Sequence, residues 1–242
     1  MPEAPEVTAL REQSAEVLEL LARRAADEHP GLRAIVGAPA LGLELVRVQP
    51  TARESARVFQ PRYGYDPEDP GVPLTRQARE RGVETELITR AATVETHPLL
   101  SSIFPRTLLG PCFVRALVID GRQAIVGGAD DAHGQRVSWI TDIPELVRAV
   151  DDLWLATLPL CTPILAEGES PPLNERQLEV ARQICLGEKD DAIARMLSVS
   201  VRTVEREVAT VLSVLGARSR AEAVLAMRGR GVNGGRRAKQ AP

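Results

Sequence analysis

The sequence of 242 residues is poor in cysteine, histidine and aromatic side chains, and it has no long apolar run. A membrane-spanning helix needs about 20 apolar residues, and no stretch of even about 18 exists here. The acidic N-terminal segment also lacks the basic region and apolar core of a signal peptide. With 44% hydrophobic and 26% charged residues, the composition is that of a globular protein. These features predict a cytoplasmic protein that does not use a membrane.

The sparse cysteines and histidines argue against several kinds of site. Three cysteines stand singly in the chain: Cys112, Cys161 and Cys185. Their odd number and the lack of CxxC or CxxH spacing predict reduced thiols. Three histidines are equally scattered, without metal-ligand spacing: His29, His97 and His133. Since no serine or cysteine nucleophile motif is present either, we expect no metal, no cofactor and no enzymatic activity.

Charge is distributed unevenly along a chain whose net charge is −3. Residues 171–242 hold 13 basic and 8 acidic residues, whereas residues 1–170 hold 17 and 25. A basic end on an acidic body is typical of a nucleic-acid-binding domain joined to a separate regulatory domain.

The most informative stretch is residues 190–208. Its apolar positions fit two short helices joined by a tight turn, and they are Ile193, Leu197, Val199, Val204 and Val208. The small Ala194 stands where two such helices cross closely, and Ser200 is placed to cap the second helix. This pattern predicts a helix-turn-helix.

The second of these helices has an apolar and a polar face. Apolar residues recur on the inward face at intervals of three and four: Val201, Val204, Val208, Val211 and Leu215. The outward face carries Arg202, Glu205, Arg206, Ala209 and Thr210. In a helix-turn-helix the outward face of the second helix enters the major groove, where its first residues meet base edges.

The flanks extend the pattern to four helices. Upstream, residues 173–180 lead to Gly187, and downstream, residues 215–224 open a last helix. Residues 171–228 therefore resemble the DNA-binding domain of the LuxR family. The resemblance implies a transcription regulator that binds double-stranded DNA as a homodimer on an inverted repeat, with RNA polymerase as a further candidate partner. We expect the DNA-contacting residues to be Lys189, Ser200, Arg202, Thr203, Glu205, Arg206, Thr210 and Arg218.

Two departures from the family pattern concern the DNA-facing residues. Glu205 and Glu207 stand where the family usually has Lys and His, and Asn174 stands where Thr is usual. A carboxylate that faces phosphate is repelled, although a glutamate can accept a hydrogen bond from a cytosine amino group. The non-specific affinity for DNA is therefore expected to be weaker than usual for the family.

The N-terminal residues 5–28 contain no glycine and no internal proline, which predicts one long helix. Its apolar stripe consists of Val7, Leu10, Val17, Leu18, Leu21 and Ala25. A lone helix cannot leave such a stripe in water, so it packs either on its own domain or on a second copy of the chain.

Between residues 31 and 162, strand patterns alternate with helix patterns. Strands are expected at residues 43–48, 83–89, 113–119, 123–126 and 135–141, and helices at 74–81, 93–104 and 144–157. Asp120-Gly121 is expected to be a hairpin turn, and the proline-rich residues 61–73 a loop. The alternation predicts an α/β sandwich.

Residues 113–128 resemble the core of a phospholipase D-type half, whose active members carry His-x-Lys-x-x-x-x-Asp before a glycine turn. Aligned on Asp120, this chain has Phe113 at the His position and Arg115 at the Lys position. The nucleophilic histidine is missing, so phosphodiester chemistry by that route is not available. Over residues 40–160 the chain is similar to degenerate domains of this kind that serve as the sensor half of TrmB-like regulators.

These patterns divide the chain into five parts. Residues 1–30 are expected to form the N-terminal helix, 31–162 the α/β regulatory domain, 163–172 a linker, 173–228 the all-α DNA-binding domain and 229–242 a disordered basic tail.

Three interpretations of the regulatory domain follow. A sensor of a small-molecule or peptide effector predicts an enclosed pocket lined by some of Phe59, Tyr63, Tyr65, Phe104, Phe113, Arg115 and Trp139. A domain that binds a protein partner predicts an exposed apolar patch instead. A phosphorylated receiver could use Asp120 as its acceptor, but residues 31–50 lack the acidic pair that a receiver needs.

Overall fold

The computed structural model describes residues 4–229, which form two compact units. The first, which we call the α/β unit, comprises residues 4–62, 70–91 and 106–163. The second, the helical unit, comprises residues 63–69, 92–105 and 164–229. We call residues 63–69 insert 1 and residues 92–105 insert 2, because both interrupt the sequence of the α/β unit.

The α/β unit is built on a mixed sheet of eight strands in the order β1-β7-β6-β5-β2-β3-β4-β8. The strands are β1 (Leu32–Val36), β2 (Ser55–Phe59), β3 (Glu84–Thr89), β4 (Thr107–Leu109), β5 (Ala116–Ile119), β6 (Gln123–Gly127), β7 (Val137–Thr141) and β8 (Thr162–Pro163). The pairs β2/β3 and β3/β4 are parallel, and the other neighbouring pairs are antiparallel.

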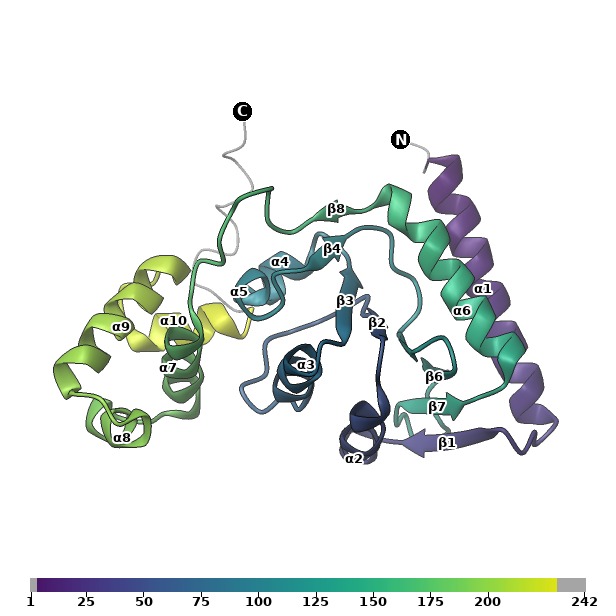
Figure 1. The fold of residues 1–242 in the computed structure, drawn as a ribbon, viewed down its shortest axis with the longest axis horizontal. Helices are drawn as coiled ribbons and strands as arrows, with labels where there is room; N and C mark the ends of the chain where they lie inside the picture. Colours follow the sequence, from purple (N-terminus) through teal and green to yellow (C-terminus); the bar gives the residue numbers. More distant parts are fainter. Residues whose placement is uncertain (1–3, 230–242) are drawn as a thin grey trace. The chain divides into compact units, whose positions relative to one another are not determined.

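Helices cover both faces of this sheet. The long helix α1 (Pro5–Ala26) and α6 (Pro144–Thr157) lie side by side, as Figure 1 shows, and bury Val17, Leu21 and Trp154 in a core shared with Phe59. The second core lies under α2 (Ala38–Val48) and α3 (Gly71–Glu80). Two short 3-10 helices follow α2 and α6, at Gln49–Thr51 and Leu158–Leu160. The expected α/β sandwich with a preceding long helix is thus confirmed. Leu10, Val17 and Leu21 of the apolar stripe pack within the same unit, whereas Leu18 is exposed.

Residues 43–48, expected as a strand, belong to helix α2, so that prediction was wrong. Leu41, Leu45 and Val48 recur at helical spacing and pack into the core, whereas Leu43 and Val46 are exposed. The apolar residues at positions 43–48 therefore lie on two different faces of a helix, one buried and one exposed, and they alternate in the sequence only by chance. The strand in this region is β1, which ends at Val36 and is followed by Gly37, a glycine with a φ of 83°.

Other sequence predictions hold, some of them with changed bounds. Helix α6 has the predicted bounds, and the hairpin between β5 and β6 is confirmed, with Asp120 and Gly121 at φ of 52° and 60°. The helix expected at residues 93–104 is split into α4 (Thr93–Thr96) and α5 (Leu100–Ile103), because Pro98 excludes its predecessor His97 from helical backbone. The strand expected from residue 113 begins only at Ala116.

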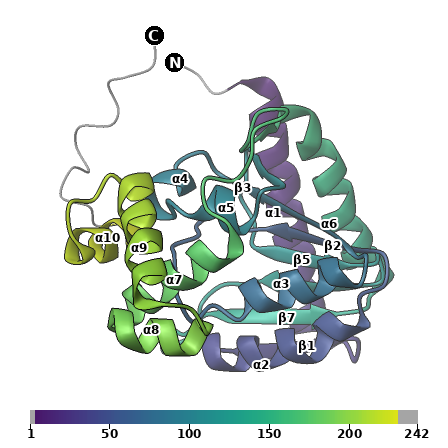
Figure 2. The same ribbon diagram turned by 60° about the vertical axis from the view of Figure 1, so that its left-hand side comes forward.

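The helical unit contains the predicted all-α domain. Its helices are α7 (Glu175–Leu186), α8 (Asp190–Leu197), α9 (Val201–Leu215) and α10 (Arg220–Met227), which Figure 2 shows gathered together. Val180, Ile184, Ile193, Val204 and Val211 form the centre of their common core and are nearly inaccessible to solvent.

Both inserts contribute to the same core. Leu99, between α4 and α5, is 0% exposed within it, and Tyr65 of insert 1 and Ile103 of insert 2 pack against it. The sequence reading did not assign these segments to the DNA-binding domain.

No helix in the described part of the chain is long and apolar enough to cross a membrane. Residues 230–242, for which a disordered basic tail was expected, lie outside the described residues.

Candidate nucleic-acid interface

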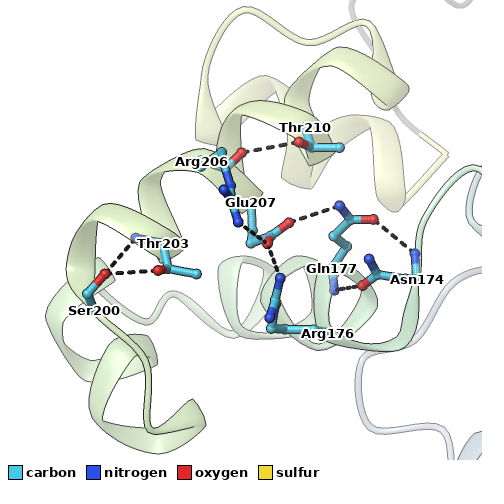
Figure 3. A network of polar contacts seen from close by, with 8 residues as sticks. All are labelled: Asn174, Arg176, Gln177, Ser200, Thr203, Arg206, Glu207 and Thr210. Atoms are coloured by element: carbon cyan, nitrogen blue, oxygen red, sulfur yellow. Dashed lines mark hydrogen bonds and ion pairs between the residues drawn. The ribbon is translucent and has the colours of Figure 1, made fainter.

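The turn between α8 and α9 has the geometry that a helix-turn-helix requires. Helix α8 ends at Ser198, which adopts left-handed backbone with a φ of 54°, and the amide of Val199 donates to the carbonyl of Ala194 over 3.0 Å. Helix α9 then begins under a cap, because the Ser200 hydroxyl accepts from the Thr203 amide over 3.1 Å (Figure 3). The expected cap at Ser200 and the two-helix pattern are confirmed.

Replacing Ser200 by alanine should lower the free energy of unfolding of the helical unit by about 1 kcal/mol, because an N-terminal amide of α9 loses its acceptor. Hydrogen exchange of α9 amides in the full chain measures this loss. Ser213→Ala is a matched control, since Ser213 lies exposed inside the same helix, where alanine is the better helix former. A loss of equal size in both variants would contradict the capping role.

The outward face of α9 is open to solvent. Arg202, Glu205 and Arg206 are exposed, and the Arg206 side chain retains 73% of its accessible surface. The Thr210 hydroxyl donates to the carbonyl of Arg206 over 3.2 Å. Val201, placed on the inward face by its spacing, is 42% exposed because it stands at the first position of the helix. Two arginines thus project from the N-terminal half of an otherwise well-packed helix.

Glu207 belongs to a different face of α9. It is 3% exposed, and its carboxylate accepts from Arg176 over 2.5 Å and from Gln177 over 2.9 Å (Figure 3). Burial by itself would raise the pKa of this carboxyl, but the hydrogen bonds from Gln177 and Arg176 outweigh burial and hold the pKa below its ordinary value. The expectation that Glu207 faces phosphate was wrong, because this side chain ties α9 to α7 inside the unit.

Gln177 also completes a cap at the start of α7. The Asn174 side chain accepts from the Gln177 amide over 3.0 Å, and the Gln177 side chain accepts from the Asn174 amide over 2.9 Å. Asparagine at position 174 therefore serves as a helix cap. Sequence reasoning missed Arg176 and Gln177, although the Asn-x-x-Gln spacing of a capping box was a signal that could have singled out Gln177.

The remaining predicted DNA-contacting residues lie outside α9. Lys189 is exposed at the N-cap position of α8, and no ion pair to it is found among residues 4–229. Arg218 pairs with Glu222 over 3.0 Å but keeps 86% of its side-chain surface accessible. Arg220, which was not singled out, pairs with Asp190 and donates to the carbonyl of Glu188.

Basic charge is nearly balanced within the described part of this domain. Residues 171–229 hold 9 basic and 8 acidic residues, so most of the positive excess of the C-terminal region comes from the 4 basic residues at 230–242. No ion pair to Arg202 is found among residues 4–229, and the Nη2 of Arg206 lies 3.6 Å from an already paired Glu207 carboxylate. The outward face of α9 is therefore a local positive surface on a nearly neutral domain.

The seven residues expected to line an effector pocket are divided between the two units. Three belong to the helical unit, where Tyr63 and Tyr65 pack against His97 with ring centroids 5.1 and 5.5 Å apart, and Tyr63 lies 5.8 Å from Phe104. Burial lowers the pKa of His97 to about 4, and the imidazole is therefore neutral at physiological pH. These aromatic residues form part of the packed interior of the helical unit.

The other four of the seven belong to the α/β unit. Phe59 is 2% exposed and packs against Trp154, with ring centroids 5.1 Å apart. The Phe113 ring lies under the guanidinium groups of Arg11 and Arg90, at 4.2 and 5.6 Å from its centroid.

Arg115 and Trp139 lie over a pair of glycines at the end of β6. A Cβ on Gly127 would come within 2.9 Å of the Arg115 guanidinium, and one on Gly128 within 2.9 Å of the Trp139 indole nitrogen. A cleft of about 530 Å³ in this unit has a separate lining: Arg47, Val48, Thr51, Arg53, Ile119, Asp120, Arg122, Gln123 and Asp142. None of the seven residues lines this cleft.

Asp120 has a structural task at the β5/β6 turn. Its carboxylate accepts from the backbone amides of Arg53, Glu54 and Ser55 over 2.8–2.9 Å. Burial would raise the pKa of Asp120, but these three hydrogen bonds hold it below its ordinary value. This arrangement speaks against Asp120 as the phosphate acceptor of a receiver domain.

Comparison with known proteins gives one family match. Residues 171–227 match the model of the bacterial regulatory proteins of the luxR family. No curated protein sequence matches the chain. Among solved structures, the chain is similar to NucT from Helicobacter pylori, at 14% identity and a TM-score of 0.44, over 55% of this chain and 98% of that one.

Two further solved structures are similar to parts of the chain. Nuc from Salmonella typhimurium, a phospholipase D family member, is 12% identical at a TM-score of 0.43, with 56% of this chain and 99% of that chain covered. TrmBL2, an archaeal chromatin protein, is 16% identical at a TM-score of 0.41, with 63% of each chain covered.

Proposed function

We propose that this chain, which carries a LuxR-type DNA-binding regulator domain at residues 171–227, is a cytoplasmic transcription regulator that binds double-stranded DNA. The observation that carries the proposal is the outward face of α9, where Arg202 and Arg206 project from a helix whose other face is buried. The first half of a recognition helix meets base edges in the major groove, and arginine is the side chain best suited to guanine there.

The other predicted contacts supplement these two arginines. Lys189 and Arg218 are exposed cations on the elements that flank α9, where contacts to phosphate would fix the register of the domain on DNA. The hydroxyl groups of three residues near the arginines would contact DNA by hydrogen bonds: Ser200, Thr203 and Thr210. Glu205 is exposed on the same face and supplies either repulsion from phosphate or recognition of a cytosine amino group.

We infer that the active form is a homodimer on an inverted repeat, with RNA polymerase as a candidate further partner. A two-fold dimer presents two recognition helices to successive major grooves. Exposed apolar residues that would favour association lie on α10, where Leu225 is 41% exposed, and on α1, where Leu18 is 37% exposed.

We assign the α/β unit a regulatory and non-catalytic role. Its candidate site for a small-molecule or peptide effector consists of Phe113, Arg115 and Trp139. The Phe113 ring is covered by two guanidinium groups, and Arg115 and Trp139 lie over the neighbouring Gly127 and Gly128. A second candidate role is the binding of a protein partner, which is favoured by Leu43 and Val46 of α2, at 75% and 52% exposed.

Arg206→Ala tests the DNA-binding proposal. Genomic fragments retained by the wild-type protein at low salt supply the probe, and fluorescence anisotropy measures the affinity of each variant. The substitution should weaken specific binding by about 1–3 kcal/mol if Arg206 reads a base. Arg148→Ala, which removes an exposed charge from the α/β unit, should leave affinity within about twofold. Failure of the wild-type protein to retain any fragment would refute the proposal.

A further inference from the structure

The DNA-binding domain does not form its core from residues 171–227 alone. Leu99 of insert 2 is 0% exposed in the core that α7, α8, α9 and α10 share, and Tyr65 of insert 1 packs against the same core. Two polar contacts fasten the inserts to the domain. Arg182 of α7 donates to the carbonyl of Pro67 over 2.8 Å, and the amide of Leu173 donates to the Ser102 hydroxyl over 3.1 Å.

The inserts are rooted in the sheet of the α/β unit through short stretches of chain. Three residues separate β2 from insert 1, and two separate β3 from insert 2. One residue then separates insert 1 from α3, and one separates insert 2 from β4. These connections are shorter than the stretch of residues 164–174 that precedes α7.

The two points where the chain leaves the sheet for the inserts, after β2 and after β3, lie at the same edge of the sheet. We call these two points the roots of the inserts. Strands β2 and β3 are parallel, with Phe59 paired to Ile88, so their carboxyl ends are neighbours. Thr89 joins the two ends, since its hydroxyl donates to the carbonyl of Gln60 over 2.6 Å. The carboxyl ends of parallel strands are where ligands of open α/β sheets generally bind.

Helix α7 connects the inserts to the recognition helix. It contacts insert 1 through Arg182, and it holds α9 through the hydrogen bonds of Arg176 and Gln177 to Glu207. The inserts do not occlude the DNA-facing surface, because Arg202 and Arg206 stay exposed. The contacts of the inserts therefore stabilise the domain without covering the outward face of α9.

We propose that inserts 1 and 2 couple the rigidity of the β2/β3 sheet edge to the rigidity of α7. Through α7 they set the affinity of α9 for DNA. This regulation rests on the DNA-binding function proposed above. A change that loosens the sheet edge loosens α7 and weakens DNA binding, and the coupling depends on the contacts between the inserts and α7.

Thr89→Val tests the proposal in the full chain without any ligand. The near-isosteric valine removes the hydroxyl that joins the two roots, and amide exchange in α7 should accelerate roughly fivefold. Glu145→Gln is the matched control, because it weakens the 2.5 Å ion pair with Arg24, which joins α6 to α1 and involves neither β2 nor β3. Equal exchange in α7 for wild type and Thr89→Val, or equal acceleration by Glu145→Gln, would overturn the proposal.

The second readout is DNA affinity in a double-mutant cycle, with a genomic fragment retained by the wild-type protein as probe. Thr89→Val should weaken binding about fivefold in the wild-type background and by a smaller factor in an Arg182→Ala background, where the hydrogen bond between α7 and insert 1 is missing. An unchanged effect in the second background would overturn transmission while leaving DNA binding intact.

If Thr89→Val does not fold, the Arg182→Ala variant replaces it, and the exchange rate of the Gln177 amide in α7 is measured. An unaltered rate in Arg182→Ala overturns the proposal. Absence of any retained fragment refutes the DNA-binding function, whereas the exchange measurement still decides the role of the inserts.

Discussion

Replacing Leu99 by alanine is expected to lower the free energy of unfolding of the helical unit by about 2–5 kcal/mol. The residue lies far upstream of the DNA-binding domain in the sequence, yet it is 0% exposed in that domain's core. Truncation removes three carbon atoms from a site enclosed by residues of other helices. The loss therefore combines the missing burial of apolar surface with a residual cavity.

Hydrogen exchange of the full chain measures this effect, because α7 and α9 belong to the helical unit. Leu146→Ala is the matched control, since Leu146 is also 0% exposed but belongs to the core under α1 and α6. It should destabilise the α/β unit and change exchange in α9 much less than Leu99→Ala does. Normal protection of α7 and α9 in Leu99→Ala would mean that the inserts are not part of the domain's core.

The helix-turn-helix could be predicted from the sequence because its signals are local. The apolar spacing of α9, the cap at Ser200 and the turn before it all depend on residues within a few positions of one another. The same holds for α6 and for the Asp120-Gly121 hairpin. In each case short-range patterns and tertiary packing agree.

The inserts could not be predicted in this way, because their partners are distant in the sequence. Tyr63 and Tyr65 stood out as aromatic residues in a proline-rich loop and were interpreted as a pocket wall. In the structure they pack against His97, and Tyr65 also packs against the core of the DNA-binding domain. Composition indicated that the loop had a task, but only the three-dimensional packing identifies its partner. Leu99 gave no signal at all, since one leucine between two short helices resembles any other.

The strand expected at residues 43–48 fails for a related reason. A window of six residues is too short to separate alternation from helical spacing. Leu43 and Leu45 fit the alternation of a strand, whereas Leu45 and Val48, three positions apart, fit a helix. The helix is favoured by Pro39 at its start and by the buried Glu44, which pairs with Arg33 over 2.7 Å and with Arg47 over 2.5 Å.

Glu205 and Glu207 present the opposite case, in which the sequence contained enough information. Residues two positions apart on a helix lie about 200° apart around the axis, so the carboxylates of Glu205 and Glu207 cannot point to the same side. Since Glu205 shares the outward face with Arg202 and Arg206, Glu207 had to point toward the interior. The structure supplies its partners there, Arg176 and Gln177.

The matched pair Glu205→Gln and Glu207→Gln is therefore expected to give opposite results. Glu205→Gln removes an exposed carboxylate from the DNA-facing surface, so affinity for DNA should rise about twofold to fivefold at low salt, with unchanged stability. Glu207→Gln removes the charged acceptor of Arg176 and should lower the free energy of unfolding of the helical unit by about 1–3 kcal/mol near pH 7. Anisotropy with a retained genomic fragment and hydrogen exchange measure the two effects.

The pH dependence separates a charge effect from a packing effect at Glu207. Its pKa in the folded protein lies below the ordinary value of 4.5, so the carboxylate stabilises the fold fully above that value. The stabilisation is lost as the pH falls through the lower pKa of the folded state, because the carboxyl is then protonated in both the folded and the unfolded state. The stability difference between wild type and Glu207→Gln should accordingly shrink below about pH 4.5. A stability difference that stays constant down to pH 3 would mean that glutamine disturbs the packing between α7 and α9. A rise in DNA affinity for Glu207→Gln equal to that for Glu205→Gln would place Glu207 on the DNA-facing surface.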